Sequence, residues 1–127
     1  MKKTFLFISA TLIWAITATV QAADLYVSPD GNHTPPFAKW AQAATNIQAA
    51  VDASVEGDTI YLADHTYLLR RPITVNKAIT IKGFNGPDDC VVDGRNDVRC
   101  FDINNASLVD LTIQHGFVRG GFIGDRE

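Results

Sequence analysis

The sequence has no concentration of basic residues, and its overall charge is slightly acidic. It contains 11 lysine and arginine residues against 14 aspartate and glutamate residues. After Lys2-Lys3, the only adjacent basic pair is Arg70-Arg71, which more simply flanks a turn before Pro72. Nucleic acids and anionic membrane surfaces attract clustered positive charge. The composition therefore argues against both as partners.

The motifs that would identify a familiar catalytic or metal site are also missing. No nucleophile elbow, phosphate-binding loop or zinc motif occurs. The three histidines, His33, His65 and His115, lie far apart and lack the spacing of metal ligands. We therefore assign no catalytic, cofactor-binding or metal-binding residue from the sequence, and we expect no cofactor.

The first 22 residues have the pattern of a signal peptide. Two lysines precede the 16-residue apolar run Phe5–Val20, and Ala22 stands before a predicted cut at Ala23. An uncleaved membrane anchor is less consistent with the run, because a bilayer span needs about 20 residues. We expect an exported protein that is periplasmic, on the outer surface or extracellular, without a stable membrane span. Residues 23–127 keep nine basic and 14 acidic residues, a net charge of −5.

Cysteine is scarce, so any disulfide would join Cys90 to Cys100. The bridge would close a loop of about 11 residues and contribute about 2.5–3 kcal/mol, and an oxidising compartment would permit it. Strand alternation places Cys90 with Val92 but Cys100 with Asp102, so one thiol is predicted to point inward and the other outward. The alternation favours two unpaired cysteines packed as small apolar residues, but the sequence leaves both alternatives open.

One short helix is expected in a chain otherwise rich in β-forming residues. Thr45 can cap it, Gln48 can complete a capping box, and Gly57 suits its end. The apolar stripe of this helix follows the spacing of Ile47, Ala50, Val51 and Ser54. Short runs rich in Ile, Val, Thr, Leu and Phe alternate with turn residues elsewhere. We expect strands at 25–27, 59–63, 72–76, 78–83, 90–94, 100–104 and 107–116.

An internal repeat relates two stretches of the predicted strands. "ITVNKAITIKG" at 73–83 is echoed by "FDINNASLVDLTIQHG" at 101–116. The first strands of the two copies match at an offset of 28 residues, and the second strands, 79–81 and 111–113, match at an offset of 32. By itself the repeat favours a β-solenoid no more than a β-sandwich.

The order of motifs along the chain resembles a known family. "LYVSPDGNHTPPFAKW", the helix "IQAAVDA", "GDTIYL", "PITVNKAITIKG", "VVDG" and "LTIQHG" follow one another over about residues 25–124. This series resembles the N-terminal region of secreted bacterial right-handed parallel β-helix proteins. Such proteins have the pectate-lyase-like fold and often occur among surface proteins of polymorphic outer-membrane type.

The resemblance implies an all-β solenoid, a right-handed parallel β-helix with one N-terminal capping α-helix. Residues 23–57 would hold the first strand, a loop and the capping helix, and 58–127 the first coils. The core ladders would then be built from Ile60, Leu62, Ile73, Val75, Ile79, Ile81, Phe101, Ile103, Leu111 and Ile113. Residues 108–116 would open a third coil and "GFVRGGFIG" would lead into further ones. We therefore expect an incomplete, truncated β-helix of about two to three coils.

Function follows less directly from the resemblance. The leading hypothesis is an exported segment of a surface or carbohydrate-contacting protein without a catalytic site of its own, whose partner is a polysaccharide or cell-surface glycan. The alternative is the N-terminal part of a polysaccharide lyase or hydrolase. A small self-contained β-sandwich binding module is a third hypothesis, which the order of motifs favours least.

Two groups of side chains are candidate sites for these functions. The first holds carboxylates that could bind Ca²⁺, with two nearby arginines: Asp88, Asp89, Asp93, Asp97, Arg95 and Arg99. Aspartate is also expected in such turns for backbone reasons alone, which is the favoured interpretation. The second holds the aromatic residues Trp40, Tyr61 and Tyr67, which could stack on sugar rings, although a structural role in cap and core is favoured.

Overall fold

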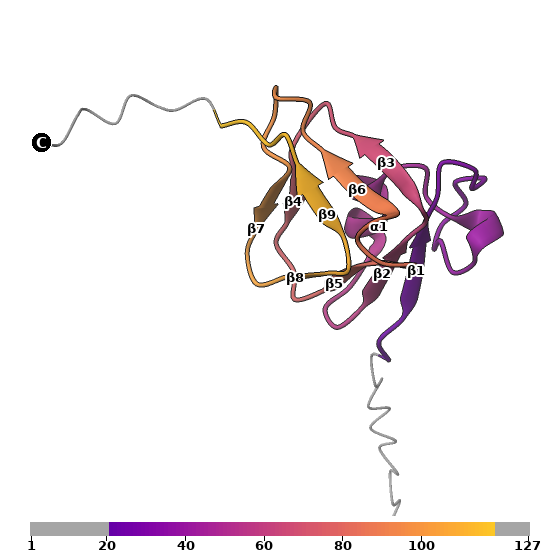
Figure 1. Cartoon of the computed structure of the whole chain (residues 1–127). Helices are drawn as coiled ribbons and strands as arrows, with labels where there is room; N and C mark the ends of the chain where they lie inside the picture. Colours follow the sequence, from indigo (N-terminus) through magenta and orange to yellow (C-terminus); the bar gives the residue numbers. More distant parts are fainter. Residues whose placement is uncertain (1–20, 119–127) are drawn as a thin grey trace, which may run out of the picture.

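Strand pairing in the computed structural model, which describes residues 21–118, is parallel throughout the named sheets (Figure 1). Sheet A has the strand order β1-β2-β5-β8, sheet B the order β3-β6-β9, and sheet C the order β4-β7. The strands are β1 (Asp24–Val27), β2 (Thr59–Leu62), β3 (His65–Leu68), β4 (Ile73–Val75), β5 (Thr80–Gly83), β6 (Cys90–Asp93), β7 (Phe101–Ile103), β8 (Ser107–Val109) and β9 (Thr112–Gln114). The 3₁₀ helix η1 (Trp40–Gln42) and the α-helix α1 (Ile47–Ala53) complete the elements.

From β2 onward the chain visits the three sheets in a fixed order. β2, β3 and β4 enter sheets A, B and C in turn, β5, β6 and β7 repeat the circuit, and β8 and β9 return to sheets A and B. Each strand pairs in parallel with its counterpart one circuit later. Mostly parallel strands with little helix are consistent with the predicted parallel β-helix.

The core is formed by inward-facing side chains that stack in rows across sheet A. Leu25, Ile60 and Ile81 occupy one row, and Val27 and Leu62 occupy the next. All five are at most 3% exposed. The second row continues at Gly83, where an added Cβ would lie 2.0 Å from the carbonyl oxygen of Asp110. The chain therefore needs glycine where β5 closes against the corner that follows β8.

The helix α1 forms where the apolar stripe predicts it, but its caps differ from the prediction. Asn46, not Thr45, is the N-cap, and its side-chain oxygen accepts from Ala49 N at 2.8 Å. Thr45 instead contacts the ring of His33. The helix ends at Ser54, three residues before Gly57. Asparagine caps helices at least as well as threonine. Asn46 is the N-cap because it directly precedes Ile47, the first buried residue of the stripe.

The side chain of Gln48 does not complete a capping box, because it extends to the edge of β4. Its Oε1 accepts from Thr74 N at 2.9 Å, and its Nε2 donates to Thr74 O at 3.1 Å. These are the two bonds that a neighbouring strand would make. Lys77 fixes the other end of α1, donating to the carbonyl oxygens of Val51 and Ser54. The helix thus covers the end of the strand stack, as a capping helix must.

One strand prediction was wrong, and one strand was missed. The segment 107–116 is not one strand, because the chain turns at Asp110 (φ 53°) and passes from sheet A to sheet B. The strand β3 was not predicted, because only Tyr67 of its four residues is buried and no alternation is visible.

The repeat is confirmed in one half and corrected in the other. Ile73 and Phe101 are register partners in β4 and β7, at the predicted offset of 28. The predicted match of 79–81 with 111–113 is wrong: β5 pairs with β8, and Ile113 of β9 pairs with Val92. The turn at Asp110 separates the two Thr-Ile motifs into different sheets.

Some predictions fall on parts of the chain that the structure does not describe. Residues 1–20, nearly all of the predicted signal peptide, lie outside the described residues, as does most of the predicted glycine-rich turn, from residue 119 onward. Among residues 21–118, none of the helices has the length and apolar character needed to cross a bilayer.

Candidate functional site

Four aromatic rings meet on the outer face of sheet A. Tyr26 and Tyr61 are register partners in β1 and β2, and their ring centroids lie 5.7 Å apart. Trp40 contacts Tyr26 at 4.6 Å and Phe84 at 5.1 Å, and Phe84 contacts Tyr61 at 6.1 Å, which closes the circle of contacts. We call Tyr26, Trp40, Tyr61 and Phe84 the aromatic surface. Trp40 is 36% exposed and Phe84 is 52% exposed, so these two rings are accessible despite their contacts, whereas Tyr26 and Tyr61 are partly buried.

The backbone positions each ring of the aromatic surface. Tyr26 and Tyr61 point outward because the residues on either side of them in β1 and β2 point into the core. Trp40 is carried by a loop that folds back along β1, where Tyr26 N donates to Phe37 O at 2.9 Å and Ala44 N donates to Tyr26 O at 2.9 Å. That loop closes only because residue 31 is glycine, since a Cβ there would lie 2.2 Å from Ala43 O.

Polar groups lie beside the rings on the same face. Lys82 is the next register partner after Tyr61, and its Nζ lies 3.7 Å from a carboxylate oxygen of Asp110. Both side chains are about half exposed, so this ion pair contributes little to stability. A second outward row holds short polar side chains: Asp24, Thr59, Thr80 and Ser107. Flat aromatic faces next to hydroxyls and a cation can receive a pyranose ring, whose C–H face stacks while its hydroxyl groups bond.

Sugar stacking and a structural role in the core were the two hypotheses for the aromatic residues, and they apply to different residues. Trp40 and Tyr61 lie on the aromatic surface, whereas Tyr67 is 7% exposed and donates to Ala63 O at 2.8 Å. Burial raises the pKa of Tyr67, and its hydroxyl serves the core. Sequence reasoning missed Tyr26 and Phe84. The outward position of Tyr26 between Leu25 and Val27 was a usable signal, but the position of Phe84 depends on the register of β5.

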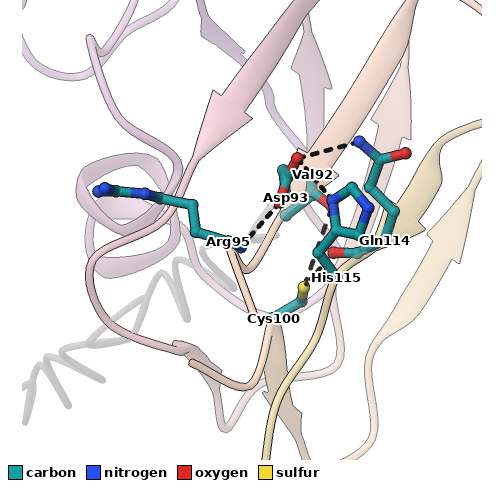
Figure 2. Close-up of polar contacts among 6 residues, drawn as sticks. All are labelled: Val92, Asp93, Arg95, Cys100, Gln114 and His115. Carbon is teal, nitrogen blue, oxygen red and sulfur yellow. Dashed lines mark hydrogen bonds and ion pairs between the residues drawn. The ribbon is translucent and has the colours of Figure 1, made fainter. Parts of the chain in front are cut away.

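A second polar cluster is centred on Asp93, at the end of β6 (Figure 2). The carboxylate is 8% exposed and accepts three hydrogen bonds: from Arg95 N at 2.7 Å, Gln114 Nε2 at 3.0 Å and His115 Nδ1 at 3.0 Å. These bonds, led by that from His115, lower the pKa of Asp93 to about 2. The carboxylate is therefore an ionised acceptor that ties β6 to the end of β9.

The cysteines are both buried, and both thiols are free. Cys90 faces the core as predicted, and burial raises its pKa to about 11. The prediction that Cys100 faces outward is wrong, because it precedes β7 in a corner where strand alternation does not apply. Its Sγ donates to Gln114 O at 3.4 Å (Figure 2), and burial raises its pKa. Protonated thiols of this kind are poor nucleophiles, so Cys100, Asp93 and His115 do not form a nucleophilic site.

The proposed calcium ligands do not converge on one point. Asp93 is used by the cluster just described, whereas Asp88 and Asp89 are exposed in the turn before β6. Asp97 and Arg99 are also exposed, and Arg99 makes a weak ion pair with Asp102 at 3.9 Å. Across residues 21–118, histidine, cysteine and acidic side chains form no group of three or more that could hold a metal ion.

Two shallow hollows lie away from the aromatic surface, between the start of α1 and the corner from β3 to β4. Their volumes are about 310 and 470 Å³. Two of the polar side chains that line the hollows are engaged elsewhere, because Asn46 caps α1 and Gln48 pairs with Thr74. The other polar residues of the lining include Thr66, Arg70 and Arg71. We place the candidate site on the aromatic surface, because four rings from separate parts of the chain contact one another there.

Parallel sheets visited in a repeating order are the architecture expected of a pectate-lyase-like fold, and a comparison with curated proteins supports that class. The chain is similar to pectate lyase PEL9 of Emericella nidulans, with 34% identity over 91 aligned residues. The match covers 65% of this chain and 22% of that protein, so the chain spans about a fifth of the length of this relative. No protein-family model matches the chain. A search of solved structures also found no match.

Proposed function

We propose that this chain is an exported polysaccharide-contacting segment of a right-handed parallel β-helix protein, with the aromatic surface as its contact site. The exposed, mutually supported rings of Trp40 and Phe84 are the observation that carries the proposal. Right-handedness is expected because crossovers between parallel strands of one sheet are almost always right-handed.

The geometry of sheet A suits a polymer of sugar rings. Neighbouring strands lie about 4.8 Å apart, a spacing similar to the length of one sugar unit along an extended polysaccharide. Tyr26, Tyr61 and Lys82 occupy successive strands in one outward row. A polysaccharide lying across the strands would meet two aromatic rings and then a cation. The position of Lys82 favours an acidic polysaccharide, as does the similarity to a protein named for pectate.

Binding to polygalacturonate tests the proposal, with neutral galactan as the comparison polymer. We expect Trp40→Ala to weaken binding at least about fivefold, because a lost aromatic contact is worth about 1 kcal/mol. Phe117→Ala is the matched control, since Phe117 is 45% exposed but lies outside the aromatic surface. Affinity electrophoresis of the three proteins would measure the effect. Equal retardation of the wild type and both variants would refute the proposed site.

The alternative function is a catalytic one, as part of a polysaccharide lyase, and the similarity to PEL9 is the observation that favours it. Within residues 21–118, the most buried carboxylate of the turn cluster, Asp93, is fully engaged in hydrogen bonds. We therefore propose that residues 21–118 bind polysaccharide without cleaving it. Release of unsaturated uronides from polygalacturonate by the purified chain would instead establish the lyase function.

A further inference from the structure

A buried carboxylate lies at the start of sheet A. Asp58 is 3% exposed. Its Oδ2 accepts from Val55 N at 2.8 Å, and its Oδ1 accepts from Ala23 N at 2.8 Å. None of the ion pairs among residues 21–118 includes Asp58. A carboxylate removed from water without a cationic partner is costly, even when neutral amides donate to it.

One of the two residues that donate to this carboxylate, Ala23, is also the residue at which the sequence predicts cleavage. Ala23 is the expected first residue after removal of the signal peptide. Its carbonyl oxygen accepts from Thr59 N at 3.0 Å, so both its backbone groups are held against β2 and the turn before it. The sequence pattern and the geometry are independent observations, and both single out Ala23.

We propose that cleavage between Ala22 and Ala23 creates an N-terminal ammonium group that forms an ion pair with the buried carboxylate of Asp58. Hydrolysis breaks the amide bond between the carbonyl carbon of Ala22 and Ala23 N. Water supplies a hydroxyl to that carbon and a hydrogen to Ala23 N. The released amine then takes up a proton, because the ordinary pKa of an α-amino group is about 7.7–8.0. The neutral amide donor 2.8 Å from Asp58 Oδ1 becomes a charged one at the same position. Charge-assisted hydrogen bonds are roughly twice as strong as neutral ones.

This ion pair links stability to export. The precursor has only the neutral amide contact at Asp58, so its folded state is less stable while it must remain competent for translocation. The mature chain gains the ion pair as soon as the signal peptide is removed. Asp58 is therefore a positioning residue for the new terminus. Through Val55 and Ala23 it also connects the turn before β2 to the start of β1.

The test uses the full 127-residue sequence, exported and processed by a secreting host. Intact mass and N-terminal sequencing should identify Ala23 as the first residue. Two variants then remove the ion pair in different ways. Asp58→Asn removes the charge, and insertion of one glycine between Ala22 and Ala23 moves the ammonium away while leaving Asp58 and the core unchanged. Asp24→Asn, an exposed change next to the terminus, is the matched control.

We expect Asp58→Asn and the glycine insertion each to lower Tm by about 4–8 °C. Combining the two should lower Tm little further, because each removes the same ion pair. Asp24→Asn should leave Tm unchanged. A different N-terminal residue, or a glycine-insertion protein with the Tm of the wild type, would overturn the proposal. In the second case a loss of Tm in Asp58→Asn alone would show that the carboxylate serves only the turn at Val55.

Discussion

The first and last described circuits of the strand stack differ in how completely their core residues are buried. Ile60, Leu62 and Ile81, in the first two circuits, are fully buried. In the last circuit Leu108 is only half buried, and Ile113 is 46% exposed although its register partner Val92 is fully buried. All of these are aliphatic residues at inward positions. A strand in such a stack is buried by the neighbours on both sides, so position in the stack determines its contribution to stability.

The two regions also differ at their edges. β1 is covered by the loop that carries Trp40, through the bridge from Val27 to Ala44. β4 is covered by the side chain of Gln48. The N-terminal end of the stack, from β1 to β5, is therefore both packed and hydrogen-bonded at its edges, and it also bears the aromatic surface. A rigid support under the rings is what a preformed binding surface needs.

The largest expected effect comes from core truncation in the middle of the stack. Ile81→Ala should lower the free energy of unfolding by about 2–5 kcal/mol, because it leaves a cavity between packed neighbours. Ile113→Ala makes the same chemical change at a half-exposed position and should cost about 1 kcal/mol or less. Urea denaturation measures both. Equal losses of unfolding free energy in the two variants would contradict the link between burial in the stack and contribution to stability.

Uncovering the edge of β4 should have a smaller effect. Gln48→Ala removes both side-chain hydrogen bonds to Thr74, and we expect a loss of about 1–3 kcal/mol. Gln42→Ala is the control, because the Gln42 side chain makes no hydrogen bond with another described residue. The amide of Thr74 should also exchange faster with solvent in Gln48→Ala. Unchanged exchange at Thr74 would mean that Gln48 does not protect this edge.

The Asp93 cluster, which joins β6 to the last circuit, should give the smallest effect, visible as a pH dependence of Tm. The folded-state pKa of Asp93, about 2, lies below its ordinary value of 3.8. Its contribution to stability is therefore fully present above about pH 4 and is lost as the pH falls through about 2. The Tm difference between the wild type and Asp93→Asn should shrink between pH 4 and pH 2. Asp88→Asn, in an exposed turn, should show no such convergence.

Much of the fold was predictable because residues close together in the sequence show its apolar stripe and its repeat. Helix α1 follows from the apolar stripe at Ile47 and Val51, and the offset of 28 residues between Ile73 and Phe101 is the true register. The strand β3 was not predictable, since three of its four residues are exposed. The turn at Asp110 was missed because "SLVDLTIQ" reads as one continuous strand until tertiary packing bends it.

The candidate site was less predictable than the fold. The aromatic surface joins residues from position 26 to position 84, which the register of three strands and the loop along β1 bring together. Trp40 and Tyr61 were considered as sugar-stacking residues beside Tyr67, which proved to be a core residue. Alternation could place Tyr26 outward, but it could not place Tyr67 or Phe84, because β3 was not recognised and the pairing of β5 with β2 was unknown.

The most direct test of polysaccharide contact is to find where an oligosaccharide binds: on the aromatic surface or on the last described circuit, β8 and β9. Amide and aromatic NMR signals of the isotope-labelled protein would be followed during titration with oligogalacturonate. We expect the shifts to concentrate at Tyr26, Trp40, Tyr61 and Lys82, while the signals of β9 remain unchanged. Shifts confined to β6 and β9, or no saturable shift at the aromatic surface, would contradict it.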